Sequence, residues 1–169
     1  DDNGYDTEIW LDRPDGDPVQ VTRTAEGSST SPAWSPDGRW LAFLADRGDG
    51  RQVHALPVEG GEALPVTAVD GGVNGYAWSP DGDRLALLRT EPRSDSAKAI
   101  EETYGRFTVE DEAYRHTHLW VVDFHPGEEP GEPRRLTGVE DPGAFTVGGF
   151  DWSPDGTRIA FDHRPDPLI

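Results

Sequence analysis

Cysteine and methionine are both absent from the 169 residues, and Lys98 is the only lysine. Without cysteine, the chain can form no disulfide and can use no thiol in catalysis. No apolar run approaches the roughly 20 residues of a membrane span, and no signal-peptide pattern stands at the N-terminus. With a mean hydropathy of −0.70, the sequence predicts a soluble protein, and we expect a cytoplasmic location.

Positive charge is also scarce. The chain has 15 basic residues against 33 acidic ones, which gives a formal net charge of −18. A surface of this sign repels phosphate backbones and anionic lipids, so we expect no nucleic-acid partner and no membrane partner. The charge indicates either a solubilising acidic surface or an adaptation to high salt.

One pentapeptide, Trp-Ser-Pro-Asp-Gly, occurs three times, at 34–38, 78–82 and 152–156. Proline pushes the residue before it towards an extended conformation. Aspartate then favours a turn through local hydrogen bonds, and glycine supplies a position with positive φ. Each copy therefore predicts the tip of a β-hairpin.

The strands that follow these turns, at 40–44, 85–88 and 159–161, are apolar at both odd and even positions. A strand with one face in water would alternate apolar and polar residues. We expect these strands to be buried on both faces. A second kind of hairpin, with a glycine-containing turn and a final threonine at Thr22, Thr67 or Thr137, alternates with the first. Two hairpins in succession make one four-stranded unit.

The spacing of the repeat indicates the architecture. Trp34 and Trp78 are 44 residues apart, within the roughly 40–45 residues of a four-stranded propeller blade. Trp78 and Trp152 are 74 residues apart, which is one period with an insertion of 30. A β-sandwich would explain short strands, but not a long repeat with the same turn at the same phase. Blades stacked around an axis also bury both faces of each sheet.

We therefore predict an all-β fold, a partial β-propeller of four-stranded antiparallel blades. Its expected parts are a half blade at 5–22, a whole blade at 32–67, a second whole blade at 76–137 and another half blade at 150–161. These six hairpins cannot close a ring of typically 4–8 blades. We expect most of the ring to lie outside this sequence at both ends, and the open blade edges to favour self-association.

The insertion, at about 89–117, differs in composition from the blades. Asp95 or Ser96 could cap a short helix that runs through Thr103 and stops at Gly105, and 106–109 could be extended. A charged excursion of this kind is most often a solvated loop. Gating of a site or contact with a partner is the alternative.

The sequence offers no catalytic nucleophile. The Gly-x-Ser-x-Gly elbow of α/β-hydrolases is missing. The serines belong to the repeated turns, at Ser35, Ser79 and Ser153, or to polar stretches expected to be loops, at Ser28, Ser29, Ser31, Ser94 and Ser96. The turn aspartates Asp37, Asp81 and Asp155 are explained by the turns without a calcium ion. The glycine pairs at 71–72 and 148–149 lead into strands rather than opening helices, so no phosphate-binding loop is expected.

Two histidines form the one conceivable metal pair. His116 and His118 would share a face of an extended strand, with Asp123 or His125 nearby. Ordinary histidines at the surface or rim are the preferred interpretation. The other two, His54 and His163, are isolated and are expected to be structural. We therefore predict no catalytic, cofactor-binding or metal-binding residue in this chain, and no cofactor.

The repeated turn followed by Leu-Ala-Phe or Ile-Ala-Phe resembles the propeller repeats of TolB-like proteins and of peptidases of the prolyl oligopeptidase family. Within the second blade, the stretches at 104–107, 111–115, 118–123 and 135–137 look like the corresponding blade of acylaminoacyl-peptidase-like members of that family. The stretch at 161–167 also resembles the link that those propellers make into their next strand. The resemblance covers nearly all of the chain.

In such peptidases, the propeller precedes an α/β-hydrolase domain that carries the catalytic residues. This chain matches none of those motifs, so the resemblance implies a non-catalytic lid that limits entry to short or unfolded peptides. Its expected partner is a peptide substrate, reached through a hydrolase domain outside this chain. The alternative is a TolB-like propeller that serves as a protein-binding module without enzymatic activity.

Overall fold

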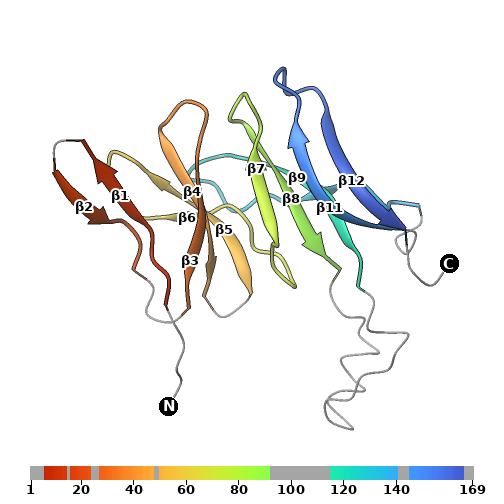
Figure 1. Ribbon diagram of the computed structural model, residues 1–169, viewed down its shortest axis with the longest axis horizontal. Coiled ribbons are helices and arrows are strands. Elements are labelled where there is room, and N and C mark those ends of the chain that lie inside the picture. Colours follow the sequence, from red (N-terminus) through yellow and green to blue (C-terminus); the bar gives the residue numbers. More distant parts are fainter. Residues whose placement is uncertain are drawn as a thin grey trace, which may run out of the picture.

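The computed structural model describes residues 6–14, 16–23, 27–47, 50–91, 115–140 and 145–165. In these ranges every regular element is a β-strand (Figure 1). The described residues contain no helix long and apolar enough to span a membrane. The strands are β1 (Trp10–Arg13), β2 (Gly16–Gln20), β3 (Ser29–Trp34), β4 (Trp40–Asp46), β5 (Arg51–Pro57), β6 (Leu64–Pro65), β7 (Gly75–Trp78), β8 (Arg84–Thr90), β9 (Thr117–Asp123), β10 (Arg134–Arg135), β11 (Phe145–Trp152) and β12 (Ile159–Pro165).

The strands form four antiparallel sheets that follow one another along the chain. Strands β3 to β6 make one four-stranded sheet and β7 to β10 make the next, and in both each strand pairs with its neighbour in sequence. The hairpin β1–β2 precedes these sheets and the hairpin β11–β12 follows them (Figure 1). The predicted fold, an all-β partial propeller with two whole blades and a half blade at each end, is confirmed.

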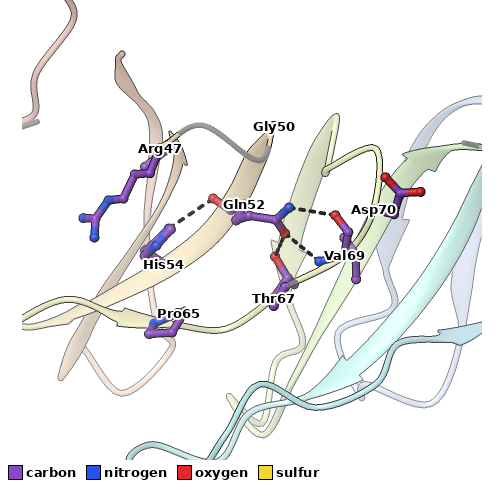
Figure 2. Close-up of a pocket in the computed structure, with 10 residues that line it drawn as sticks. Arg47, Gly50, Gln52, His54, Pro65, Thr67, Val69 and Asp70 are labelled. Atoms are coloured by element: carbon purple, nitrogen blue, oxygen red, sulfur yellow. Dashed lines mark hydrogen bonds between the residues drawn. The ribbon is translucent and has the colours of Figure 1, made fainter. Parts of the chain in front are cut away.

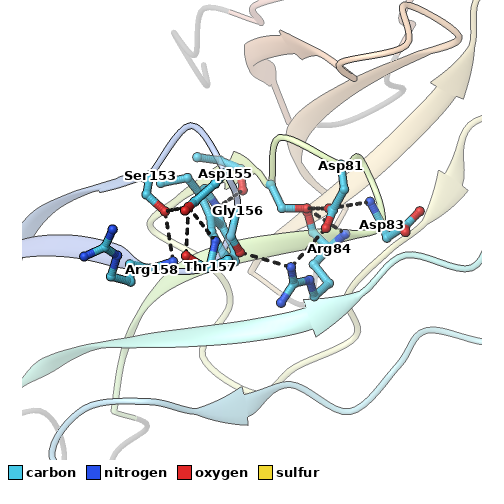
Figure 3. Close-up of polar contacts among 11 residues, drawn as sticks. Asp81, Asp83, Arg84, Ser153, Asp155, Gly156, Thr157 and Arg158 are labelled. Carbon is cyan, nitrogen blue, oxygen red and sulfur yellow. Dashed lines mark hydrogen bonds and ion pairs between the residues drawn. The ribbon is translucent and has the colours of Figure 1, made fainter.

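Each Trp-Ser-Pro-Asp-Gly copy forms the turn of a hairpin, and its serine and aspartate satisfy the backbone there. Ser35 Oγ donates to Asp37 Oδ1 at 2.6 Å and accepts from the Trp40 N–H at 2.9 Å. Gly38 has a φ of 69° and donates its N–H to the Ser35 carbonyl at 2.9 Å. The turns at 78–82 and 152–156 repeat these hydrogen bonds (Figure 3).

These hydrogen bonds also favour the ionised aspartates. The serine hydroxyl, followed by a backbone N–H, holds the pKa of Asp37 and of Asp155 below the usual value. The same two donors lower the pKa of Asp81 to about 2. Because a hydroxyl and an amide that point at one oxygen stabilise its negative charge, the turn accounts for each aspartate.

The strand after each turn is buried on both faces, as its sequence predicts. In β4, Leu41, Phe43 and Ala45 pack towards the hairpin β1–β2. The alternate residues, Ala42 and Leu44, pack with the strands of the following blade. A blade therefore contributes one apolar face to each of its neighbours, and the core of the molecule consists of the layers between blades.

Consecutive blades also share the same hydrogen bond. Trp78 Nε1 donates to the carbonyl of Ala33, and Trp152 Nε1 donates to the carbonyl of Ala77, both at 3.3 Å. In each case the acceptor is the residue just before the tryptophan of the preceding repeat. The tryptophan of the motif thus fixes the position of one blade relative to the preceding blade.

Strand β3 begins earlier than predicted. Ser29 and Ser31, which we expected in a loop, lie in this strand, so that prediction is wrong. The pairing of β3 with β4 shifts between Thr30 and Ala33, and Ser31 has a φ of 56°. This β-bulge interrupts the alternation by which a strand is recognised. It also presents the Ser31 carbonyl to the hydroxyl of Tyr76 in the next blade, at 2.6 Å.

Strand β8 ends at Thr90, before the insertion, and strand β9 begins at Thr117, after it. The short helix predicted from Asp95 or Ser96 and the extended stretch predicted at 106–109 lie outside the described residues. The serines Ser94 and Ser96 lie outside them as well.

The turn serines differ in burial, and this difference generates a prediction. Ser79 is fully buried, whereas Ser153 is only half-buried. We expect Ser79→Ala to lower the free energy of unfolding by roughly 1–3 kcal/mol, because the Arg84 N–H loses an acceptor that water cannot replace. Ser153→Ala should cost less than about 1 kcal/mol, since water reaches that turn. Urea denaturation of both variants measures the difference, and equal losses would contradict it.

Candidate functional site

A threonine lies two residues beyond each of the outer strands β2, β6 and β10 and bonds to the chain beside it. Thr67 Oγ1 accepts the N–H of Val53 at 2.9 Å and donates to Gln52 Oε1 at 2.8 Å. Thr22 makes the same two bonds to the Ile9 N–H and to Glu8 Oε2, at 2.8 and 2.6 Å. We call this arrangement the threonine contact. Because the side chain of Thr67 takes the backbone donor of Val53, strand β6 ends at Pro65, before the threonine that the sequence predicts as the last residue of the hairpin.

The third threonine contact contains a histidine. Thr137 Oγ1 accepts the N–H of Leu119 at 3.0 Å and lies 3.3 Å from His118 Nδ1. His118 therefore stands where the other contacts have Gln52 and Glu8. Gly138 follows with a φ of 63°, and a Cβ there would lie 2.3 Å from His118 Cε1, so only glycine fits against the imidazole. A threonine beside a histidine can be a nucleophile and its base, but the repeat explains this pair as a strand contact.

His118 is fully buried and His116 is 8% exposed. The prediction of surface or rim histidines is therefore wrong for both. Packing of the following hairpin against β9 explains their burial: His116 Nδ1 lies 3.1 Å from Thr146 Oγ1, and the His118 ring meets Phe145 edge-on at 5.7 Å.

The two histidine rings are 6.3 Å apart between centroids. Asp123 lies at the opposite end of β9 and His125 beyond it, both exposed, so neither joins the histidine pair and the conceivable metal site does not assemble. Across the described residues, no group of three or more histidine, aspartate or glutamate side chains could hold a metal ion. His163 is exposed on β12 but not isolated, since its ring lies 4.9 Å from that of Phe145.

A cavity of about 570 Å³ opens on β5 at the end of the blade opposite the repeated turns (Figure 2). His54 lines it and is 6% exposed, and the ring stacks on Phe43 with centroids 5.8 Å apart. His54 Nδ1 lies 3.3 Å from the carbonyl of Gln52, so this nitrogen carries the proton and Nε2 is left as an acceptor. Burial, and then the charge of Arg47, lower the pKa of His54. The imidazole is therefore neutral at pH 7.

This cavity has no signal in the sequence, because its lining combines residues from three separate stretches. Arg47 follows β4, Gln52 and His54 belong to β5, and Asp70 lies beyond β6. Arg89 of the next blade reaches back and donates to the Asp70 carbonyl at 3.2 Å. The cavity and the base of the insertion are therefore neighbours on one end of the blades.

At the base of the insertion, two guanidinium groups lie close to one indole. Arg89 and Arg135 lie over the ring of Trp120, with Cζ at 4.6 and 5.6 Å from its centroid. Arg135 also forms an ion pair with Glu91 at 2.8 Å, and both side chains are largely buried. Within the described part of the chain, Arg89 Nε and Trp120 Nε1 are buried donors without an acceptor. This end of the molecule can bind polar or anionic groups.

Comparison with models of known protein families finds no match. Among curated proteins, the chain is 43% identical over 74 residues to the uncharacterised peptidase YuxL of Bacillus subtilis, which covers 43% of this chain and 11% of that protein. It is 26% identical over 171 aligned positions to dipeptidyl-peptidase 5 of Porphyromonas gingivalis, which covers 86% of this chain and 23% of that protein. The chain thus spans less than a quarter of either relative.

Solved structures show the same fold. A structure assigned to TolB from Agrobacterium tumefaciens matches 94% of this chain and 50% of its own, with a TM-score of 0.54 and 21% identity. The acylaminoacyl peptidase of Pyrococcus horikoshii matches 83% of this chain and 21% of its own, with a TM-score of 0.53 and 19% identity. The resemblance to TolB-like repeats and to the propeller portion of prolyl oligopeptidase family peptidases is confirmed.

The buried, neutral His54 predicts a pH dependence of stability. Its pKa is lowered in the folded chain, whereas an unfolded histidine titrates at about 6.5. The unfolded state then takes up a proton first, so the free energy of unfolding falls as the pH drops below about 6.5. We expect His54→Gln to flatten this part of the curve, measured by urea denaturation between pH 5 and pH 8. His125→Gln, at an exposed position, is the control. An unchanged slope in His54→Gln would contradict the prediction.

Proposed function

We propose that this chain is part of the non-catalytic propeller of a serine peptidase that acts on short peptides or on acylated or free aminoacyl N-termini. The observation that carries the proposal is its sequence similarity to two peptidases, at 43% identity over 74 residues and at 26% over 171 aligned positions. Both relatives are several times longer than this chain, so the catalytic residues would belong to a hydrolase domain outside it.

In this proposal the propeller gates the entry of substrate. Blades that share buried apolar layers, and at two junctions a tryptophan hydrogen bond, form a rigid wall. A rigid ring admits a short or unfolded peptide and excludes a folded chain by size. The cavity beside His54 and the arginine cluster at the base of the insertion lie on the same end of the blades, where they would contact a peptide that passes. A cytoplasmic location remains a prediction.

A TolB-like propeller that binds another protein without enzymatic activity is the second candidate. The structural likeness to TolB is compatible with it, but a likeness at 21% identity concerns the fold alone and fits both functions. The two candidates differ in what accompanies the propeller. The peptidase requires a hydrolase domain in the same polypeptide, whereas the binding module requires none.

The peptidase proposal is tested with a fluorophosphonate probe, which reacts with an activated serine. We expect the full-length product of the reading frame that encodes this chain to become covalently labelled, and the 169-residue chain alone to remain unlabelled. A folded full-length protein that takes no label would contradict the proposal and favour the binding module.

Gating requires a separate measurement on full-length enzyme that has not been treated with the probe, because the covalent label blocks the serine. We expect hydrolysis of a short peptide and no cleavage of the same sequence held inside a folded domain. Unfolding that domain should restore cleavage, because the chain can then enter the ring. Cleavage of the folded form at the rate of the free peptide would contradict gating but leave the peptidase assignment intact.

A further inference from the structure

The cavity beside His54 results from side-chain size at three positions of its blade. The register of the strands shows which residues of the next blade hold the same positions. The equivalent pairs are Ala45 and Arg89, His54 and Trp120, and Pro65 and Arg135. In the second blade, two guanidinium groups and an indole lie together at this place. In the first blade, a methyl group, an imidazole and a pyrrolidine ring leave the cavity of about 570 Å³.

The strands that face this cavity belong to the described chain. Ala45 and His54 lie on the face of the blade that packs towards β1–β2, the outer half of the preceding blade. That half blade lacks its inner pair of strands. Inner strands pack against inner strands, as β3 does against β7, so the missing pair would lie against β3 and β4 rather than against β5 and β6. The cavity is therefore a feature of the outer strands and not of the open end.

Two of the polar side chains that line the cavity are already bonded to the chain. Gln52 Nε2 donates to the carbonyl of Val69 at 2.8 Å, and Gln52 Oε1 accepts the Thr67 hydroxyl at 2.8 Å and the Val69 N–H at 3.1 Å. The Thr67 hydroxyl oxygen also accepts the N–H of Val53 at 2.9 Å. These hydrogen bonds hold one wall of the cavity in place and leave neither side chain available to a ligand.

His54 and Arg47 are the polar side chains that remain for a ligand. His54 is 6% exposed, and no described residue forms a hydrogen bond with its Nε2. Arg47 is exposed and forms no ion pair within the described residues. Burial, and after it the charge of Arg47, lowers the pKa of His54, so the guanidinium lies near the imidazole. Figure 2 shows both on the same side of Gln52. The cavity thus offers a buried acceptor next to a cation.

A carboxylate next to an amide N–H would satisfy both groups. A guanidinium binds a carboxylate through charge-assisted hydrogen bonds, and the unprotonated nitrogen of a neutral imidazole accepts an N–H. A buried acceptor without a partner is costly, so the N–H of a ligand is bound favourably there. In the last residue of a peptide, and in an N-acylamino acid, the carboxylate and the amide nitrogen are attached to the same carbon.

We propose that the cavity binds the C-terminal residue of a short peptide or an N-acylamino acid. In this complex the ligand's carboxylate lies on Arg47, and its amide N–H donates to His54 Nε2. The apolar part of the lining, which includes Ala45, Pro65 and Val69, contacts the rest of the ligand.

The recognition follows from the cavity alone, whereas its role rests on the proposed function. When a peptide bond is hydrolysed, the C–N bond breaks, the carbonyl carbon gains the hydroxyl of water, and the nitrogen gains a proton. The fragment released from the N-terminal side therefore acquires a new carboxylate. If this fragment is an acylated residue or a short peptide, that carboxylate lies beside an amide N–H. The cavity would then bind the product of the proposed reaction.

The first test is isothermal titration calorimetry on the full-length protein, after treatment with the fluorophosphonate probe to block an activated serine. We expect saturable binding of N-acetylalanine and of alanylalanine, and the tighter of the two identifies the kind of ligand. Propionate lacks the N–H and alanylalanine amide lacks the carboxylate, so both should bind roughly tenfold more weakly or worse. If these two bind as tightly as the first pair, or if none of the four binds, the proposal is overturned.

The second test places the binding at the cavity. We expect Arg47→Gln to weaken the binding of N-acetylalanine roughly tenfold or more, because a charge-assisted hydrogen bond is lost. Arg39→Gln removes the same charge at an exposed turn and should bind as the unsubstituted protein does. His54→Phe keeps a ring beside Phe43 but removes the acceptor, so it should weaken N-acetylalanine and leave propionate unchanged.

Unchanged binding in Arg47→Gln would overturn the site. Labelling of the unsubstituted protein by the fluorophosphonate probe is scored separately. A protein that takes no label but binds N-acetylalanine through Arg47 would contradict the peptidase proposal and support the cavity site. A protein that takes the label but binds none of the four compounds would do the reverse.

Discussion

Burial of both faces of each sheet is the constraint on which the structure depends. A sheet that is apolar on both sides needs a neighbour on each side, and a row of such sheets remains open at its two ends until it closes on itself. In β4, one set of alternate residues packs towards β1–β2 and the other towards the next blade. Blades packed in this way must keep a constant alignment with one another. The indole hydrogen bonds from Trp78 and Trp152 to the preceding blade maintain it.

The sequence predicted the parts of the fold that rest on strong local signals. The three turns follow from proline, aspartate and glycine at fixed positions. The buried strands follow from apolar residues at both odd and even positions. The sequence failed at Ser29 and Ser31, because a β-bulge at Ser31 breaks the alternation that reveals a strand. It also placed the ends of β6 and β10 too late, since the threonine side chains replace backbone pairing there.

The candidate site was less predictable than the fold, because its residues meet only through packing between strands. His118 has no local signal that separates it from a surface histidine, and its burial depends on Phe145, which lies 27 positions later in the sequence. The cavity at His54 likewise combines Arg47, Gln52 and Asp70 from different stretches. The sequence does show the recurrence of threonine at the end of each second hairpin. Aligning the repeats on these threonines also places Gln52 and His118 at equivalent positions.

The threonine contact has one backbone geometry and three different partners, an acid at Glu8, an amide at Gln52 and an imidazole at His118. Within a single molecule, this amounts to a natural substitution series at one position. The amide protons of Ile9, Val53 and Leu119, which the three threonines accept, act as internal probes of that series. Their exchange with solvent would compare how an acid, an amide and an imidazole hold the same strand, with the temperature, the buffer and the rest of the chain held in common.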